Sequence, residues 1–160
     1  MPFESVPVVD PRAQALLGEY FAFRESTFPA AHGYVVRMPT AGAFAPPDGE
    51  FVLATDGDGE AIGCGGIRRL DGGVLPDVAG AVYEVKHLWV RETGRGGGAG
   101  RALLTELERR AAAYGAHTVV LDTNVSLTAA NRLYASSGYR SIPAYNDNGN
   151  ATTWYRKDLA

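Results

Sequence analysis

Apolar residues near the start of the chain recur at close to helical spacing: Leu16, Leu17, Tyr20, Phe21 and Phe28. This period indicates an amphipathic helix. Asp10 followed by Pro11 is typical of a helix start, because aspartate caps free N–H groups and proline suits the first helical position. We therefore predict a helix from about Arg12 to Thr27, after a short extended segment from Val6 to Val9.

Three apolar runs in the middle of the chain predict strands. Phe51–Thr55 and Ala61–Ile67 are separated by Asp56–Gly59, whose residues suit a hairpin turn. The longest run, Ala81–Val90, follows a turn-rich stretch. Residues Met38–Glu50 are rich in proline, glycine and alanine, so we predict an irregular segment or one short helix there.

The second half of the chain predicts helices alternating with strands. A helix from about Gly98 to Tyr114 carries an apolar stripe and ends before Gly115, a residue that suits a helix C-terminus. A buried strand, a helix and two closing strands follow: His117–Leu121, Ser126 or Thr128 to Ser137, Tyr139–Ile142 and Thr152–Lys157. The order β-α-β-β-β-α-β-α-β-β predicts an α/β (α+β) fold, with a central mixed sheet and helices on both faces. We expect one domain over residues 1–160.

Composition narrows the classes of function. The net charge is −3 without a basic stripe, which argues against a nucleic-acid partner. Cys64 is the only cysteine, so a zinc site built on several thiolates is excluded and we predict no metal. The first residues do not resemble a signal peptide and no apolar run could span a membrane, so we expect a cytoplasmic protein with no membrane partner.

The strongest chemical signal is a glycine-rich loop between a predicted strand and a predicted helix. Its residues are Arg95, Gly96, Gly97, Gly98, Ala99, Gly100 and Arg101. Glycines let a backbone approach a ligand closely, and the free N–H groups of a helix start attract anions. The two bracketing arginines are suited to bidentate phosphate bonds. The pattern therefore indicates a pyrophosphate site.

Other interpretations of this loop are weaker. It lacks the Gly-Lys-Ser/Thr of a P-loop. Gly94-x-Gly96-x-x-Ala99, with Asp122 after the next strand, partly matches a dinucleotide fingerprint. However, only 38 residues follow Asp122, too few for a second nucleotide-binding half. A flexible glycine turn with no ligand is the remaining alternative.

Two stretches together resemble the GCN5-related N-acetyltransferase (GNAT) family. Glu84–Val90 followed by Arg95–Leu104 is similar to its coenzyme motif. That motif is a strand with an apolar-aromatic-valine ending and then Arg/Gln-x-x-Gly-x-Gly/Ala opening a helix. Ala130–Tyr139 resembles the second motif, a helix carrying Leu-Tyr followed by Gly-Tyr. The resemblance implies acetyl-CoA as co-substrate and direct acetyl transfer to an amine, on a small molecule or a protein. It also suggests a monomer or a homodimer.

The resemblance implies two catalytic residues. Glu84 occupies the place of the family's base, which commonly acts through water. The structural alternative is a carboxylate paired with Lys86 or a neighbouring basic group. His87 and water itself are rival bases. Tyr134 matches the tyrosine that protonates the departing thiolate, as a phenol can. Its alternative role is that of a core aromatic residue.

Coenzyme contacts are implied in the same way. Backbone groups of Leu88, Trp89 and Val90 would bind the pantetheine arm and supply the oxyanion donor. Family members often place an asparagine seven residues before the tyrosine, where this chain has Leu127, so Asn124 and Asn131 are candidate substitutes.

The acceptor is the least determined part of the site. The resemblance places its binding around residues 21–34 and 145–150, where Glu25, Asp147 and His32 are available to attract a cation. Two alternatives to an active acetyltransferase remain, a non-catalytic acetyl-CoA-binding module and a dinucleotide-binding oxidoreductase.

Overall fold

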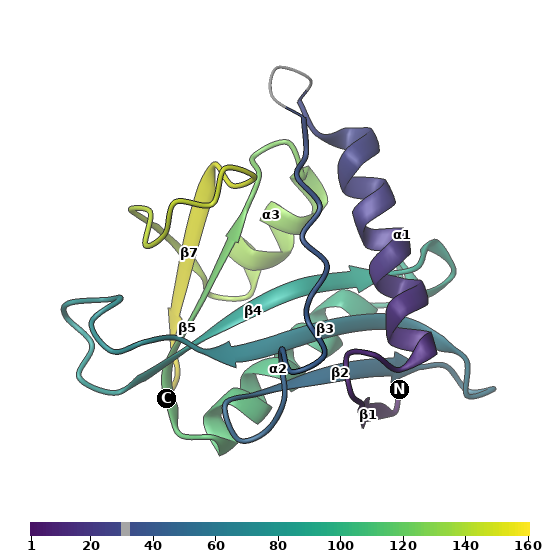
Figure 1. Ribbon diagram of the computed structural model, residues 1–160, viewed down its shortest axis with the longest axis horizontal. Coiled ribbons are helices and arrows are strands. Elements are labelled where there is room, and N and C mark those ends of the chain that lie inside the picture. Colours follow the sequence, from purple (N-terminus) through teal and green to yellow (C-terminus); the bar gives the residue numbers. More distant parts are fainter. Residues whose placement is uncertain (30–32) are drawn as a thin grey trace.

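A seven-stranded mixed sheet organises the chain in a computed structural model that describes residues 1–29 and 33–160 (Figure 1). The strand order is β1-β2-β3-β4-β5-β7-β6, and only β4 and β5 pair in parallel. The strands are β1 (Phe3–Ser5), β2 (Gly49–Thr55), β3 (Ala61–Arg69), β4 (Ala81–Val90), β5 (Ala116–Thr123), β6 (Arg140–Ile142) and β7 (Thr153–Asp158). The helices are α1 (Pro11–Thr27), α2 (Ala99–Ala113) and α3 (Thr128–Ser136), with a short 3-10 turn, η1 (Glu92–Gly94).

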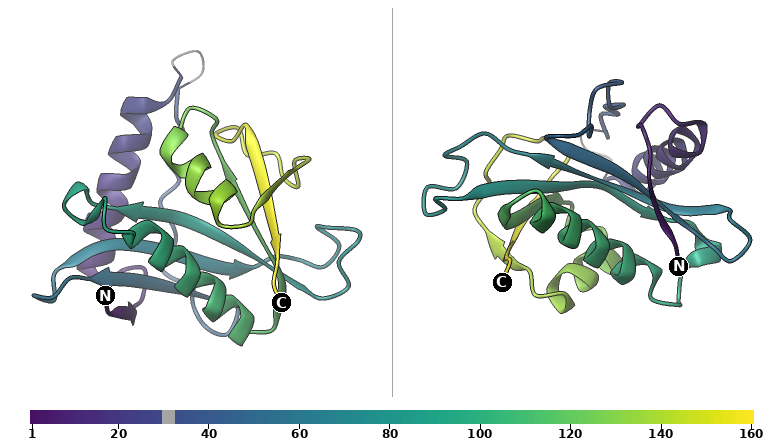
Figure 2. Two further views of the ribbon diagram at one scale, coloured as in Figure 1. Left: turned by 180° about the vertical axis from the view of Figure 1, so that it is seen from behind. Right: turned by 90° about the horizontal axis from the view of Figure 1, so that it is seen from below.

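Helices cover both faces of the sheet, which confirms the predicted fold class (Figure 2). Successive side chains of β2 alternate between the two hydrophobic cores, one on each face of the sheet. Phe51 and Leu53 belong to the core cluster that contains α1 residues, whereas Val52 and Ala54 belong to the cluster that contains α2 residues. Because neighbouring side chains in a strand point to opposite faces, the continuous apolar run that predicted β2 is what a strand covered on both sides requires.

Small residues in β3 let α2 lie close to the sheet. A Cβ added at Gly65 would lie 2.6 Å from Cδ1 of Leu107, a fully buried residue of α2. On the opposite face, a Cβ at Gly66 would meet the ring of Phe44 at 2.7 Å. The glycines of β3 therefore fix how closely the layers pack on either side of the central strands.

The centre of the sheet parts between β4 and β5. Their parallel pairing ends at Glu84↔Val120, although both strands continue beyond it. On its other side β4 carries a bulge, since Cys64 pairs with Trp89 and Gly66 pairs with Lys86. His87 and Leu88 thus lie opposite Gly65 alone, and His87 takes the unusual φ of 57°. Bulges bend a strand, which is consistent with β4 turning away from β5.

One local prediction needs correction. The N-terminal strand is Phe3–Ser5 rather than Val6–Val9, because Pro7 lacks the N–H that a ladder needs while Val6 and Val8 are buried in the core. Residues 41–48 form turns, in agreement with the irregular alternative, and β2 begins at Gly49, two residues earlier than predicted. The bounds of β4 match the prediction, and those of the other predicted helices and strands agree to within about two residues, both β3 and β5 ending two residues later than predicted.

The close approach of α2 to β3 yields a stability prediction. We expect Gly65→Ala to destabilise the fold by about 1–3 kcal/mol through overpacking and Leu107→Ala by about 2–5 kcal/mol through a cavity. The double variant should cost less than the sum, because the new methyl enters space left by Leu107. Urea unfolding measures all three free energies.

The control is Gly72→Ala, since a Cβ there would meet nothing within 4 Å. It should leave the free energy of unfolding nearly unchanged. Additive costs at Gly65 and Leu107 would contradict the packing described here.

Candidate functional site

A cavity of about 1160 Å³ lies where β4 and β5 part. Its walls come from α1, residues 34–44, the second half of β4, the loop before α2, the end of β5 and the first part of α3. Residues 146–151, in the connection from β6 to β7, complete the wall. Segments far apart in the sequence thus meet at one opening in the sheet.

The glycine-rich loop forms one end of this cavity. Gly96 and Gly98 have φ angles of 84° and 81°, a region that residues with a side chain rarely adopt. A Cβ at Gly96, Gly97 or Gly98 would meet no heavy atom within 4 Å, so the loop is open on its outer surface. Gly98, Ala99 and Gly100 line the cavity at the start of α2, where the first N–H groups lack intrahelical partners. The loop has the properties of a phosphate cradle.

The two arginines that bracket the loop differ in their bonding. Arg95 donates through Nε to the carbonyl of Val90 at 2.8 Å, and its guanidinium lies 4.8 Å from the Trp89 ring. Its terminal nitrogens make no hydrogen bond to the described residues. Arg101 instead binds the end of α3, donating to Ser136 Oγ at 2.7 Å and Ser137 Oγ at 3.0 Å. Both residues line the cavity, but Arg95 has more free donors.

The end of β4 supplies backbone to the cavity. Leu88, Trp89 and Val90 all line it, and β4 has no strand partner on the β5 side beyond Glu84. Main-chain groups of an unpaired strand edge can bind an extended ligand by adding to the sheet. The predicted pantetheine contacts therefore lie where the geometry provides open backbone.

Tyr134 of α3 lies at the cavity wall and is 7% exposed. Its ring contacts the rings of Tyr139 and Tyr155, which fix its position. Its hydroxyl makes no hydrogen bond to the described residues. Burial raises the pKa of Tyr134 above its ordinary value, so the phenol keeps its proton at neutral pH. The side chain thus packs in the core and lines the cavity at the same time.

The two predicted asparagine ligands are used inside the protein instead. The Asn124 side chain accepts from the Ser126 N–H at 3.0 Å and donates toward the Asn150 carbonyl at 3.4 Å. Asn131 donates to the Asn124 and Leu127 carbonyls and accepts from the Tyr155 hydroxyl at 2.8 Å. Neither residue lines the cavity, so the geometry does not support them as coenzyme ligands.

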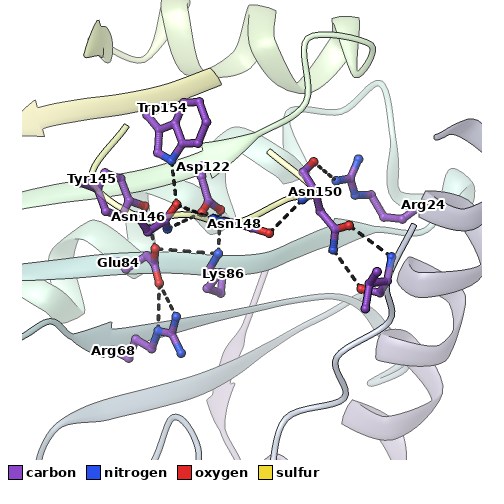
Figure 3. A network of polar contacts seen from close by, with 11 residues as sticks. Arg24, Arg68, Glu84, Lys86, Asp122, Tyr145, Asn146, Asn148, Asn150 and Trp154 are labelled. Atoms are coloured by element: carbon purple, nitrogen blue, oxygen red, sulfur yellow. Dashed lines mark hydrogen bonds and ion pairs between the residues drawn. The ribbon is translucent and has the colours of Figure 1, made fainter. Parts of the chain in front are cut away.

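Glu84 is a junction of buried polar contacts rather than a free carboxylate (Figure 3). It is 1% exposed and does not line the cavity. One oxygen accepts from Arg68 Nε at 2.9 Å, and the other accepts from the Tyr145 hydroxyl at 2.6 Å. Lys86 Nζ lies 3.8 Å away. The pairing with Lys86 that the sequence suggested is thus present, but Arg68 and Tyr145 are closer.

Asp122 is the carboxylate that lines the cavity next to this junction. It accepts from Lys86 Nζ at 2.6 Å and from the amides of Asn146 and Asn148 at 2.7 and 3.1 Å (Figure 3). Burial alone would raise the pKa of Asp122, but the Lys86 charge and these hydrogen bonds hold it below the ordinary value. Sequence analysis named Asp122 only in the dinucleotide alternative and missed its asparagine contacts, because those residues lie more than twenty positions away.

His87 lines the cavity within a set of aromatic rings, those of Tyr20, Phe21 and Phe44. Its Nδ1 is buried and has no hydrogen-bond partner among the described residues. Burial, together with the charges of Lys86 and Arg68, lowers the pKa of His87 to about 3. An imidazole with so low a pKa is a weak base at neutral pH.

The groups suggested to attract a cationic acceptor do not gather at the cavity. Asp147 lines it and is exposed, whereas Glu25 is exposed and lies outside the lining. His32 falls outside the described residues. The charged side chain that α1 contributes is Arg24, which is 4% exposed. Sequence analysis did not single it out, because an arginine in the last turn of a helix is ordinarily solvated.

Over the part of the chain that the structure describes, no helix is long and apolar enough to cross a membrane. The same residues hold no group of three or more histidine, cysteine or acidic side chains placed to bind a metal ion.

Comparison with known proteins gives this geometry a context. The chain is 32% identical over 124 residues to an IAA acetyltransferase of Azospirillum brasilense, covering 78% of this chain and 74% of that protein. A solved structure of a Klebsiella pneumoniae protein, assigned as an acyl-CoA N-acyltransferase, superposes with a TM-score of 0.78 at 23% identity. The match covers 99% of this chain and 97% of that one.

A second solved structure, an aminoglycoside 6'-N-acetyltransferase complexed with coenzyme A, has a TM-score of 0.65 at 16% identity, with 99% and 97% coverage. At these identities the two solved structures establish a shared fold. The family model described as "Acetyltransferase (GNAT) family" matches residues 13–139, which include the cavity's glycine loop, β4 and Tyr134. The chain therefore belongs to the GNAT acetyltransferase family.

Proposed function

We propose that the protein transfers the acetyl group of acetyl-CoA directly to an amine. The observation that carries this proposal is the single cavity that joins the glycine loop, the open edge of β4 and Tyr134. Gly96–Gly100 and Arg95 would hold the pyrophosphate, and the backbone of Leu88–Val90 would bind the pantetheine arm. A non-catalytic acetyl-CoA-binding module would not need a buried tyrosine at the same wall.

Tyr134 is the general acid in this proposal. When the amine nitrogen bonds to the thioester carbon, the carbon–sulfur bond breaks and the sulfur leaves as a thiolate. A protonated phenol in the cavity wall supplies the proton that the thiolate takes up. Backbone N–H groups near the bulge of β4 would bind the oxyanion of the intermediate.

Glu84 is proposed as the base that takes the proton from the amine through water. The geometry restricts how it can act, because both carboxylate oxygens are bonded and the residue does not line the cavity. Lys86 lies 3.8 Å from Glu84 and 2.6 Å from Asp122, and both Lys86 and Asp122 line the cavity, so in this proposal the proton would pass this pair to reach Glu84. Asp122 is accordingly the competitor for this role.

We expect Tyr134→Phe to lower kcat by about 10²-fold or more, the usual contribution of a positioned acid. The affinity for acetyl-CoA should change little, since the ring and its packing remain. Steady-state kinetics with calorimetric acetyl-CoA binding measure both quantities. Wild-type turnover in this variant would show that Tyr134 is only a core residue.

Arg95→Ala should weaken acetyl-CoA binding by about 1.5–3 kcal/mol, the range for hydrogen bonds to charged groups. The matched control is Arg132→Ala, an exposed arginine that does not line the cavity. Calorimetric titration with acetyl-CoA measures this affinity, and a parallel titration with NADH tests the dinucleotide alternative. Binding of acetyl-CoA without binding of NADH would exclude that alternative. Unchanged affinity in Arg95→Ala would place the pyrophosphate elsewhere.

The variants Glu84→Gln and Asp122→Asn distinguish which of the two carboxylates acts as the base. We expect Glu84→Gln to lower kcat at least about 10²-fold, because glutamine cannot accept the proton. Asp122→Asn should have the smaller effect on kcat. The reverse order would assign the base to Asp122, and thermal unfolding of both variants controls for damage to the polar junction.

A further inference from the structure

Arg24 is a buried cation without a counter-ion. It is 4% exposed, and it forms no ion pair with the described residues. Nε and Nη1 are shielded from solvent and have no hydrogen-bond partner among those residues. Since Nε carries one hydrogen and Nη1 carries two, three of the five guanidinium donors are unused.

The contacts that Arg24 does make are weak for a buried charge. Nη2 lies 3.4 Å from the carbonyl oxygen of Asn150 (Figure 3). The guanidinium lies 4.8 Å from the Tyr34 ring centre and 5.7 Å from that of Phe28. Its place in the last turn of α1 adds a favourable interaction with the helix dipole. None of these contacts supplies the negative charge that a desolvated guanidinium requires.

Negative groups near the cavity do not supply it either. Asp122 is paired with Lys86 and bonded to two asparagine amides. Asp147 is exposed, and Glu25 lies outside the cavity lining. Glu84 is bonded to Arg68 and Tyr145. Within the described residues, the guanidinium therefore has an incomplete set of partners at a cavity wall.

Arg24 lines the same cavity as Tyr134, the proposed acid, and its charge acts on the Tyr134 hydroxyl. Aromatic residues line this cavity as well: Tyr20, Phe21 and Tyr34. The coenzyme's phosphates have a separate site at the glycine loop, where Arg95 is available. The unused donors of Arg24 are therefore available to an anion other than the pyrophosphate.

We propose that Arg24 binds the carboxylate of the acceptor, so that the substrate is an amine that also carries a carboxylate and an apolar or aromatic body. This inference rests on the proposed acetyl transfer and specifies its substrate class. A guanidinium fork matches a carboxylate in geometry as well as in charge. The aromatic wall around it suits the apolar body.

The test compares amino acids with their carboxamides as acceptors, beginning with L-phenylalanine and L-phenylalaninamide. The protein should prefer the carboxylate member by kcat/KM, after correction for the fraction of free amine. Arg24→Met should reduce that preference by roughly 30-fold or more, the range for removing one partner of a buried charge pair. Arg24→Lys, which keeps the charge without the fork, should retain part of it.

A second readout does not depend on turnover. 3-Phenylpropionate, which has the carboxylate and the ring but no amine, should bind the protein–acetyl-CoA complex and raise its melting temperature. Arg24→Met should abolish this shift. Without ligand, Arg24→Met should melt at the same temperature as the wild type or higher, because an unpaired buried charge is removed.

The control is Arg37→Met, an exposed arginine on the same cavity whose loss should leave the carboxylate preference unchanged. Equal use of carboxylates and carboxamides by the wild type, or a lower melting temperature of ligand-free Arg24→Met, would overturn the inference and make Arg24 structural. Acetyl-CoA binding and acetylation of the carboxamides would still support the proposed function. Failure to bind acetyl-CoA would instead remove that function itself.

Discussion

The parting of β4 and β5 is the constraint on which the rest of the site depends. Parallel strands that stayed paired would use their main-chain groups on each other, and no ligand could enter the sheet. Here the pairing stops at Glu84↔Val120 and the bulge at His87 and Leu88 bends β4. The exposed edge that results is a place where an extended ligand can complete the hydrogen bonding that the sheet leaves unfinished.

Side chains replace the missing main-chain bonds next to this opening. Lys86 of β4 and Asp122 of β5 meet at 2.6 Å, while Glu84 ties the same region to β3 through Arg68. Removing one member of such a buried group leaves an uncompensated charge, which costs more than the pair contributes when intact. Glu84 and Asp122 therefore stabilise the fold in addition to any catalytic role. Kinetic effects of substituting them must be interpreted together with the stability of each variant.

The sequence predicted the features that depend on local chemistry. The bounds of β4 and the glycine loop follow from the apolar run and the residue types, whereas the place of Tyr134 at the site was implied by the family resemblance. The sequence failed where the partner of a side chain lies far along the chain. Nothing near Asn131 in sequence shows that the Tyr155 hydroxyl donates to it, and nothing near Glu84 indicates Tyr145. Such contacts depend on how β5, β7 and α3 pack against one another. Hydrophobic periodicity and secondary-structure propensity do not contain this information.

Sequence analysis also failed to predict the charge of the acceptor region, because it does not show which charged side chains are buried. Counting acidic residues in the two predicted segments suggests a site for a cation, yet folding leaves Glu25 in solvent and turns Arg24 inward. Burial strengthens the electrostatic interaction between a charged side chain and a ligand, because water screens an exposed carboxylate but not a desolvated guanidinium. One buried arginine with unused donors is therefore stronger evidence for the charge of the ligand than several solvated acids. The unpaired arginine also implies that the ligand-free protein is less stable than a variant with an apolar residue at this position.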